Sequence, residues 1–345
     1  MIDHSLSCFS NFHCLAGRCP STCCAGWEVD LDEQILSYYR WLSGPLGEEI
    51  RSHIQTADGY TFFTLQEGRC PFLNSDNLCR LILSLGDNAL SVTCREHPRF
   101  VEEYGTLRET CLSISCPEAA RLLLKGPVAL VCRETAEASE EDWSLDQGYL
   151  QELLEYRQIL FHATQVQRPL AERLSFLIVS ANEIGTYKDS GAFSDGDRIE
   201  TTVCRTETPV ALSEHLQQVP APALELDLPG FFRTMEQMEF TSDQLPTLLK
   251  SISACLDSNL LQDNSEAGTH LLLYFLYRYV LRAVWDGQVR EKVLFAVYAT
   301  ATILCLSRSM PSPDPLRQAA VLFSREVEHS DENLDLLYAF LNGEP

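Results

Sequence analysis

The sequence predicts a mainly α-helical protein with a cysteine-rich, metal-binding module at its N-terminus. Eleven of the fourteen cysteines lie in the first 132 of the 345 residues, where turn-forming residues leave room for short helices and irregular loops. From residue 149 onward, apolar residues recur at steps of three and four, the period of a helix that buries one face. We therefore expect a cysteine-rich module at 1–133, an acidic linker at 134–147 and an α-helical domain at 148–345.

Composition and charge restrict the function. The formal net charge is −23 at pH 7, so the surface repels nucleic-acid phosphates and anionic lipid. The first residues lack the basic and apolar segments of a signal peptide. The longest apolar run, Val293–Leu306, is shorter than the ~20 residues of a membrane-spanning helix. These features predict a cytoplasmic protein with no nucleic-acid or membrane partner, in which clustered cysteines more often bind metal than form disulfides.

Local signals place the elements of the first third. A helix begins at Asp30–Asp32 and ends where Ser43–Pro45 breaks the pattern. The stretch Gly59–Leu65 is rich in β-forming residues and predicts a short strand. Pro117, followed by Glu118 in the first turn, starts a helix that continues to about Leu124.

The remainder reads as successive helices. One contains Tyr149 and Leu160, and a second covers Leu170–Ile184. Residues 185–209, with glycines at 185, 191 and 196, predict a mobile loop. Leu271–Leu281 is apolar nearly all round, which indicates a central helix. Further helices are expected near residues 227–240, 243–260, 268–285, 289–307, 314–329 and 331–341.

The spacing of the cysteines indicates which kind of site they can form. The two groups are Cys14-x4-Cys19-x3-Cys23-Cys24 and Cys70-x8-Cys79-x14-Cys94, with Cys116 after them. Soft thiolates in this arrangement suit Zn²⁺ or an iron–sulfur cluster. Neither the repeated Cys-x2-Cys of zinc knuckles nor the Cys-x3-Cys-x2-Cys loop of radical enzymes occurs. The side chains of Cys23 and Cys24 diverge as neighbours, so only one is expected to reach a given metal. Buried thiols without a metal are the alternative interpretation.

Four stretches carry a resemblance to a known family. They are Cys14-x4-Cys-Pro-x-Thr-Cys-Cys-x-Gly-Trp-x-Val, Cys-Pro-Phe-Leu-x5-Cys, Leu-Gly-x3-Leu-Ser-x2-Cys-Arg-x-His-Pro-Arg and Leu-Ser-x-Ser-Cys-Pro-Glu-Ala-Ala-Arg-Leu-Leu-Leu. Over about residues 8 to 125 the chain resembles the flagellin lysine-N-methylase (FliB-type) family. Its front part is similar to the YkgJ-type cysteine-cluster proteins.

The resemblance implies a protein-lysine N-methyltransferase that holds an iron–sulfur cluster of the [4Fe-4S] type. It also implies S-adenosylmethionine as methyl donor and lysine side chains of flagellin as acceptor. By matching positions, the metal-ligand pool is Cys14, Cys19, Cys23, Cys24, Cys70, Cys79, Cys94 and Cys116. The remaining cysteines are not expected to bind metal. Three fall outside the matching stretches, Cys8, Cys111 and Cys132, and three are expected to be core or loop thiols, Cys204, Cys255 and Cys305. The alternative function is a non-enzymatic iron–sulfur or zinc protein that acts as a redox sensor or interaction module.

Several other side chains have both a functional and a structural interpretation. Trp27 either shields a cluster or packs, and His97 either ligates a metal or packs. Four arginines either meet the charge of a cluster or donor or form surface ion pairs: Arg95, Arg99, Arg108 and Arg121. Four tyrosines of the late helices either contact a methylated ammonium or pack: Tyr274, Tyr277, Tyr279 and Tyr298.

Lysine methylation needs a neutral amine and an in-line displacement, without a radical. The cluster is therefore expected to be a structural staple or a redox gate. The sequence identifies no catalytic base and no donor pocket.

Overall fold

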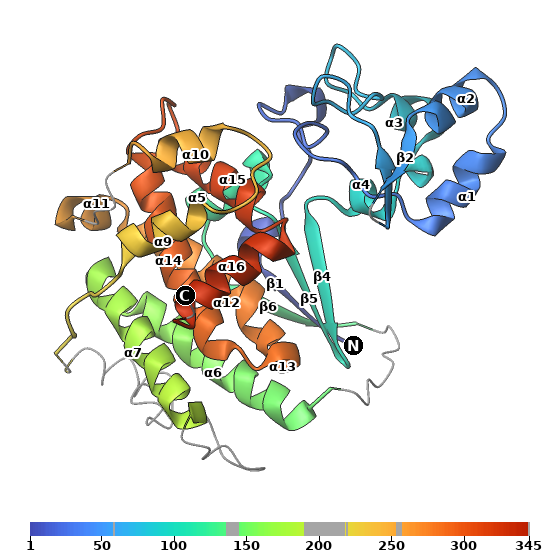
Figure 1. Ribbon diagram of the computed structural model, residues 1–345. Helices are drawn as coiled ribbons and strands as arrows, with labels where there is room; N and C mark the ends of the chain where they lie inside the picture. The colour runs from blue at the N-terminus through green and yellow to red at the C-terminus, as the bar shows by residue number, and fades with distance from the viewer. Residues whose placement is uncertain (58, 136–144, 190–217, 219, 253–256, 344–345) are drawn as a thin grey trace.

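The computed structural model describes residues 1–57, 59–135, 145–189, 218, 220–252 and 257–343. Over these residues the protein is mainly helical, with a four-stranded and a two-stranded sheet (Figure 1). The predicted dominance of helix is confirmed. None of the helices described here is both long and apolar enough to span a bilayer.

The four-stranded sheet was not predicted and corrects the expectation of irregular loops between short helices. Its strand order is β4 (Arg99–Tyr104), β5 (Leu107–Leu112), β1 (Ile2–Leu6) and β6 (Leu130–Glu134). Strand β1 runs parallel to β5 and antiparallel to β6, while β4 and β5 form a hairpin. The N-terminal strand thus lies in the middle of a sheet whose other strands come a hundred residues later.

A buried charge explains why strand β5 has no clear sequence signature. Its buried positions alternate as Leu107, Glu109 and Cys111, so a carboxylate interrupts the apolar alternation that indicates a strand. Arg157 of α6 (Gln147–Gln165) pairs with Glu109 in two bonds, Nη1–Oε2 at 2.7 Å and Nη2–Oε1 at 2.6 Å. His4 Nδ1 of strand β1 lies 3.2 Å from the same carboxylate. This network joins the sheet to the helices.

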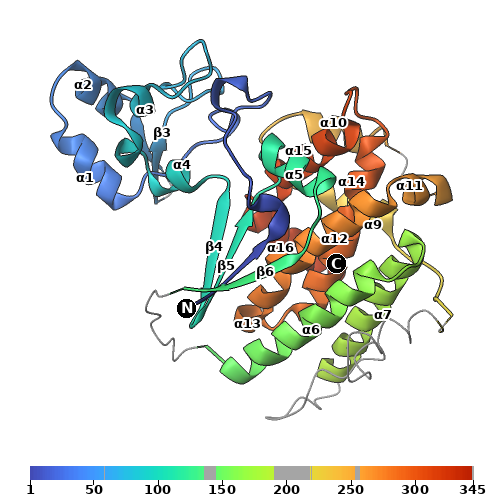
Figure 2. The ribbon, with the colours of Figure 1, turned by 180° about the vertical axis from the view of Figure 1, so that it is seen from behind.

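Two late helices form the centre of the helical body. They are α12 (Ser265–Tyr279) and α14 (Val289–Ser307), and both are almost wholly buried. Tyr277 of α12 donates its hydroxyl hydrogen bond to the His4 carbonyl at 2.8 Å, which packs this helix against the sheet. Figure 2 shows α12 and α6 beside the sheet, while α7 lies behind them and packs against α6 and α14. The apolar run Val293–Leu306 lies within α14 and is buried in the core.

The other predicted helices agree in part. Three lie close to their predicted positions: α9 (Leu228–Met235), α15 (Pro315–Val327) and α16 (Asp331–Leu341). The predicted helix at 243–260 is instead two, α10 (Gln244–Leu249) and α11 (Ser258–Asp263), because the Asp257 side chain accepts a bond from Leu260 N and caps a new start. The predicted helix at 268–285 is also divided, by a 3-10 turn at Val280–Arg282 before α13 (Ala283–Asp286).

Helix α7 runs from Leu170 to Asp189. It therefore extends past its predicted end at Ile184 and includes the first residues of the loop predicted at 185–209. The remainder of that loop, 190–209, lies outside the described residues.

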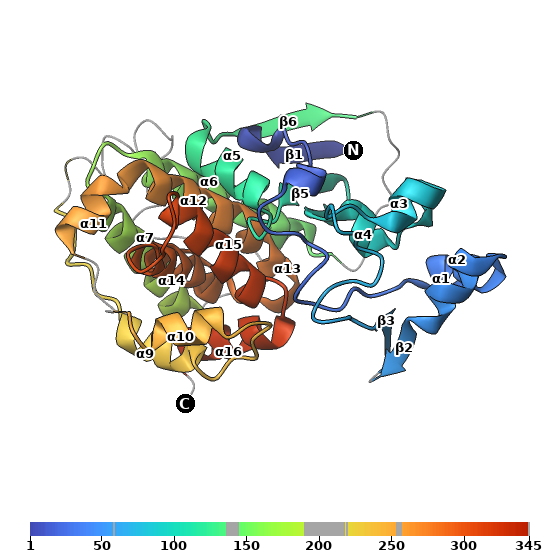
Figure 3. The same ribbon diagram turned by 90° about the horizontal axis from the view of Figure 1, so that it is seen from above.

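Residues 31–94 form a small lobe with its own core. Its elements are α1 (Glu33–Trp41), α2 (Pro45–Ser52), β2 (Ile54–Ala57), β3 (Tyr60–Phe63), α3 (Arg80–Leu85) and the start of α4 (Val92–Glu96). Tyr39, Phe63 and Phe72 are buried at its centre. The predicted first helix and the short strand are confirmed as α1 and β3. Figure 3 shows this lobe set apart from the helical body.

The main hydrophobic core contains residues from both ends of the chain. Leu6 and Leu112 of the sheet pack with Leu272 and Val293 of the late helices. Helix α5 (Pro117–Lys125), confirmed where it was predicted, contributes Leu123 to the same core. The predicted linker at 134–147 includes residues 136–144, which lie outside the described residues, so the domain division stays a prediction.

Candidate functional site

The cysteine-rich loop 13–30 runs between the small lobe and the helical body. On the lobe side, Cys70 N donates to Cys24 O at 2.8 Å, and Gly26 N donates to Gly68 O at 2.9 Å. On the helical side, Arg325 of α15 donates to the carbonyls of Ser21 and Thr22 at 3.3 and 3.1 Å. The loop is therefore held by contacts from both parts of the chain.

Six of the eight predicted metal ligands line one cavity of about 220 Å³. They are Cys14, Cys19, Cys23, Cys24, Cys79 and Cys116. The other two, Cys70 and Cys94, pack against the core of the small lobe and interact electrostatically with Cys24 and Cys79. All eight thiols are free of disulfides. The fold thus gathers cysteines from positions 14 to 116 around one space, which we call the cysteine cavity.

The thiols of this cavity influence one another's ionisation. Burial raises the pKa of Cys70 to about 12 and that of Cys94 to about 11, and neighbouring thiolates add to both shifts. A hydrogen bond from Cys23 lowers the pKa of Cys24 to about 7, while the same contact raises the pKa of Cys23. Thiolates crowded together repel one another, and a bound cation would offset this repulsion by attracting each of them.

The donor set therefore suits a thiophilic metal, although the side chains do not form a ready-made ligand group. Across the described part of the chain, no three Cys, His, Asp or Glu side chains converge closely enough to hold a metal ion. Cys79 and Cys116 immediately precede helices α3 and α5, whose first backbone N–H groups contact their sulfurs and offset part of the rise in pKa that burial causes. Metal ligation by the eight cysteines stays a prediction.

The remaining described cysteines lie away from this cavity. Cys8 and Cys111 are buried in the main core, Cys305 is buried in α14, and Cys132 is exposed on β6. Cys204 and Cys255 lie outside the described residues.

Trp27 and His97 occupy different cavities. His97 lines the cysteine cavity, where burial lowers its pKa to about 4 and keeps the ring neutral at physiological pH. Trp27 lines the neighbouring pocket, and its indole N–H donates to Cys23 O at 2.9 Å. Its ring lies 6.0 Å from that of His97 and 5.2 Å from that of His329. Trp27 therefore forms part of the partition between the two spaces.

The four arginines selected from the sequence line neither cavity. Three form ion pairs, Arg95 with Glu96, Arg108 with Asp3 and Arg121 with Glu118, and Arg99 lies over the ring of Phe12. The contacts agree with the ion-pair interpretation for Arg95, Arg108 and Arg121, whereas Arg99 contacts an aromatic ring.

The four tyrosines also have structural partners. Tyr274 and Tyr279 donate to the buried carboxylate of Glu328, and Tyr277 bonds to the sheet. Tyr298 accepts from Asp227 N. None of the four lines either cavity described here.

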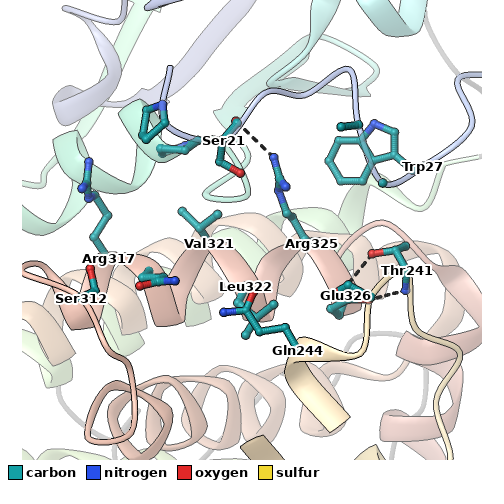
Figure 4. A pocket seen from close by; sticks show the side chains of 16 residues that line it. Ser21, Trp27, Thr241, Gln244, Ser312, Arg317, Val321, Leu322, Arg325 and Glu326 are labelled. Atoms are coloured by element: carbon teal, nitrogen blue, oxygen red, sulfur yellow. Dashed lines mark hydrogen bonds between the residues drawn. The ribbon is translucent and has the colours of Figure 1, made fainter. Parts of the chain in front are cut away.

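A second, larger pocket adjoins the cysteine cavity. Its volume is about 440 Å³, and its walls come from the 20–27 loop, helix α15 and residues 241–244. Figure 4 shows Arg317, Val321 and Arg325 along α15, with Trp27 facing them from the loop. Ser21, Pro117 and Arg325 line both spaces. We call this second space the adjoining pocket.

Arg325 is one of the residues that line both spaces, and the sequence did not reveal it. It lies over the Trp27 ring at 5.2 Å and bonds to the cysteine-rich loop. Burial lowers its pKa, and the thiols of Cys23, Cys19 and Cys116 oppose that shift. Its neighbour Glu326 is 2% exposed and accepts bonds from Thr241 N, Thr241 Oγ1 and Ser242 Oγ at 2.7, 2.9 and 2.9 Å. No local pattern in the sequence marks either residue.

Comparisons with known proteins give three curated relatives. The lysine-N-methylase of Salmonella choleraesuis (strain SC-B67) is 31% identical over 132 residues, which cover 36% of this chain and 33% of that protein. The lysine-N-methylase of Salmonella typhimurium (strain LT2) gives the same values. The flagellar biosynthetic protein FliU of Salmonella muenchen is 31% identical over 136 residues, covering 36% of this chain and 78% of FliU.

The chain spans about a third of the length of the two curated lysine-N-methylases that it matches. No family model matches the chain, and neither does any solved structure.

Proposed function

Because the chain belongs to the family of the flagellar biosynthetic protein FliU, we propose that it is a protein-lysine N-methyltransferase. The observation that carries this proposal is the 31% identity to two proteins named lysine-N-methylase. We propose S-adenosylmethionine as the methyl donor, lysine side chains of flagellin as the acceptor, and the cytoplasm as the place of action. The name of FliU supports the flagellar connection.

The proposed reaction moves one methyl group. The lone pair of a neutral lysine Nζ attacks the methyl carbon, the sulfur–carbon bond breaks, and its electron pair stays on sulfur. The products are S-adenosylhomocysteine and a methylated ammonium, which passes its extra proton to solvent. Positioning and exclusion of water supply most of the acceleration of such a displacement.

The adjoining pocket meets two requirements of this step. Val321 and Leu322 form an apolar part of its wall, which helps to exclude water. The guanidinium groups of Arg317 and Arg325 face the same space. The positive charge of Arg325 disfavours a lysine ammonium beside it and so lowers the pKa of the amine that must attack, whereas the Glu326 carboxylate on the same lining acts in the opposite direction.

We also propose that the cysteine cavity holds an iron–sulfur cluster of the [4Fe-4S] type, with Zn²⁺ as the alternative. The ligands would come from Cys14, Cys19, Cys23, Cys24, Cys70, Cys79, Cys94 and Cys116. Six of them line one cavity: four belong to the cysteine-rich loop, and Cys79 and Cys116 stand just before α3 and α5, which supports this assignment. The group would supply structural cross-linking, because the methyl displacement requires no electron transfer.

Co-expression with flagellin tests the proposed function. Flagellin produced together with this chain, in a host that lacks a lysine methylase, should carry methyl groups on lysine side chains. Tandem mass spectrometry of tryptic peptides locates them, and flagellin from the host without the chain provides the baseline.

Unmodified lysines in both samples would contradict the proposed methyltransferase activity. They would favour the alternative function, a redox sensor or interaction module built on the same cysteines. The short span of the match supports keeping this alternative, since two thirds of each lysine-N-methylase has no counterpart in the alignment.

A further inference from the structure

The adjoining pocket has the size and construction of a small-molecule site. Its volume of about 440 Å³ lies within the ~300–1,000 Å³ of typical ligand pockets. Its walls come from segments that are about 300 residues apart in sequence, as the contact between Ser21 and Arg325 shows. The pocket is therefore a product of the tertiary fold and not of one loop.

The wall formed by α15 presents an arginine that has no acidic partner among the described residues, Arg325. Arg317, Val321 and Arg325 are spaced at i, i+4 and i+8, so they share one face of α15. Among the described residues, Arg325 forms no ion pair, and it donates hydrogen bonds to the carbonyls of Ser21 and Thr22. Arg317 shares the carboxylate of Asp314 with Lys125. A guanidinium in this position is a suitable partner for the carboxylate of a ligand.

Other parts of the lining favour a cation and a flat ring. The carboxylate of Glu326 is buried and fixed in place by Thr241 and Ser242. Trp27 presents its indole to the same pocket (Figure 4). Aromatic faces attract both cations and stacked heteroaromatic rings. The pocket thus suits a ligand that combines a carboxylate, a positive centre and an aromatic base.

We infer that the adjoining pocket is the binding site of S-adenosylmethionine. Its carboxylate would pair with Arg325, while its sulfonium and adenine would lie toward Glu326 and Trp27. This inference rests on the proposed function. It also places the donor beside the cysteine cavity, separated from it by the 20–27 loop, and not inside it.

Calorimetric titration with S-adenosylhomocysteine tests the assignment. The full chain, purified without oxygen, should bind this product. Val321→Phe fills the pocket, and Arg325→Gln removes the charged partner of the carboxylate. We expect Arg325→Gln to weaken binding by about tenfold or more, the usual effect of losing a charged hydrogen bond. We expect Val321→Phe to weaken it to a similar degree, because the larger side chain occupies the space of the ligand. Arg308→Gln is the matched control, because Arg308 pairs with Asp257 and lies outside the pocket; its affinity should equal that of the unmodified chain.

Val321→Phe is the decisive variant, because it keeps the contacts of Arg325 with the cysteine-rich loop. Unchanged affinity in Val321→Phe, or no binding by the unmodified chain, would overturn the assignment. The proposed function can fail separately: if S-adenosylhomocysteine binds, Val321→Phe weakens it, and flagellin still stays unmethylated, the donor pocket stands and the lysine acceptor does not.

Discussion

Cys79→Ser should remove most of the iron and sulfide from protein purified without oxygen, and lysine methylation should disappear with them. Cys79 lines the cysteine cavity at the start of α3, and a serine hydroxyl is a much poorer ligand for iron than a thiolate. The proposed ligands span residues 14 to 116. Closing loops of that length stabilises the folded state by ~3–5 kcal/mol each, by analogy with covalent cross-links. Iron and sulfide analysis, a melting temperature and a methylation assay on one preparation measure all three effects.

Cys132→Ser is the matched control for this prediction. Cys132 is exposed on β6, away from the cysteine cavity, so its variant should retain the iron, the melting temperature and the activity. Equal losses of iron, melting temperature and activity in both variants would contradict the cysteine cavity as the metal site. If the purified protein is colourless and contains zinc but no iron, the cavity binds Zn²⁺ in place of the cluster, through the same cysteines.

The same preparations decide what the cluster does. A structural role predicts that the melting temperature and the activity fall together in Cys79→Ser. It also predicts that oxidising an intact cluster leaves activity nearly unchanged. We favour this role because the cavity joins loops that have little regular structure. Activity that changes reversibly with redox potential, at a constant melting temperature, would instead establish a redox gate.

Glu109→Gln should lower the free energy of unfolding by about 3–5 kcal/mol, because it leaves the fully buried guanidinium of Arg157 without its anionic partner. Arg157 is 0% exposed and Glu109 is 5% exposed. Urea denaturation measures the change as a lower midpoint with an unchanged slope.

Arg108→Gln is the control, since it breaks the neighbouring pair with Asp3, whose side chains are 24% and 28% exposed. It should cost less than about 1 kcal/mol. A cost for Glu109→Gln no larger than that of Arg108→Gln would contradict the role of the buried pair.

Glu109 also makes the stability of the protein depend on pH. Burial alone would raise the pKa of Glu109, but Arg157 and His4 hold it below its ordinary value. A carboxyl group with a lowered folded-state pKa stabilises the protein above its unfolded pKa, and this contribution is lost as the pH falls through the folded value. Stability of the unmodified chain should therefore fall more steeply on acidification than that of Glu109→Gln. Parallel acid limbs in urea titrations would contradict this assignment.

The helices were predictable because their signals are local. Val289–Ser307 and Asp331–Leu341 match their predicted bounds, since a run of core-facing residues repeats within each segment. The main sheet was not predictable in the same way. Strand β1 pairs with strands that begin at Leu107 and Leu130, and Glu109 breaks the alternation in β5. Pairings between distant segments leave no periodic trace in a single sequence.

In the candidate site, too, the local features were predictable and the contacts between distant segments were not. The cysteine spacing together with the family resemblance predicted that cysteines from position 14 to 116 belong to one ligand pool, and the fold brings six of them to one cavity. The arginines expected near the site are close to the cysteines in sequence, but it is Arg325, 304 residues after Ser21, that bonds to the cysteine-rich loop. Its position depends on how α15 packs against the cysteine-rich loop, and no local motif records that contact.

Methyl transfer with purified components tests the central claim most directly. The chain, purified without oxygen, is incubated with flagellin and with S-adenosylmethionine that carries a deuterated methyl group. We expect deuterated methyl groups on lysine Nζ of flagellin with the unmodified chain and with Cys132→Ser, and none with Cys79→Ser. Flagellin that remains unlabelled, although the chain retains its metal, would contradict the claim that this protein is a lysine methyltransferase.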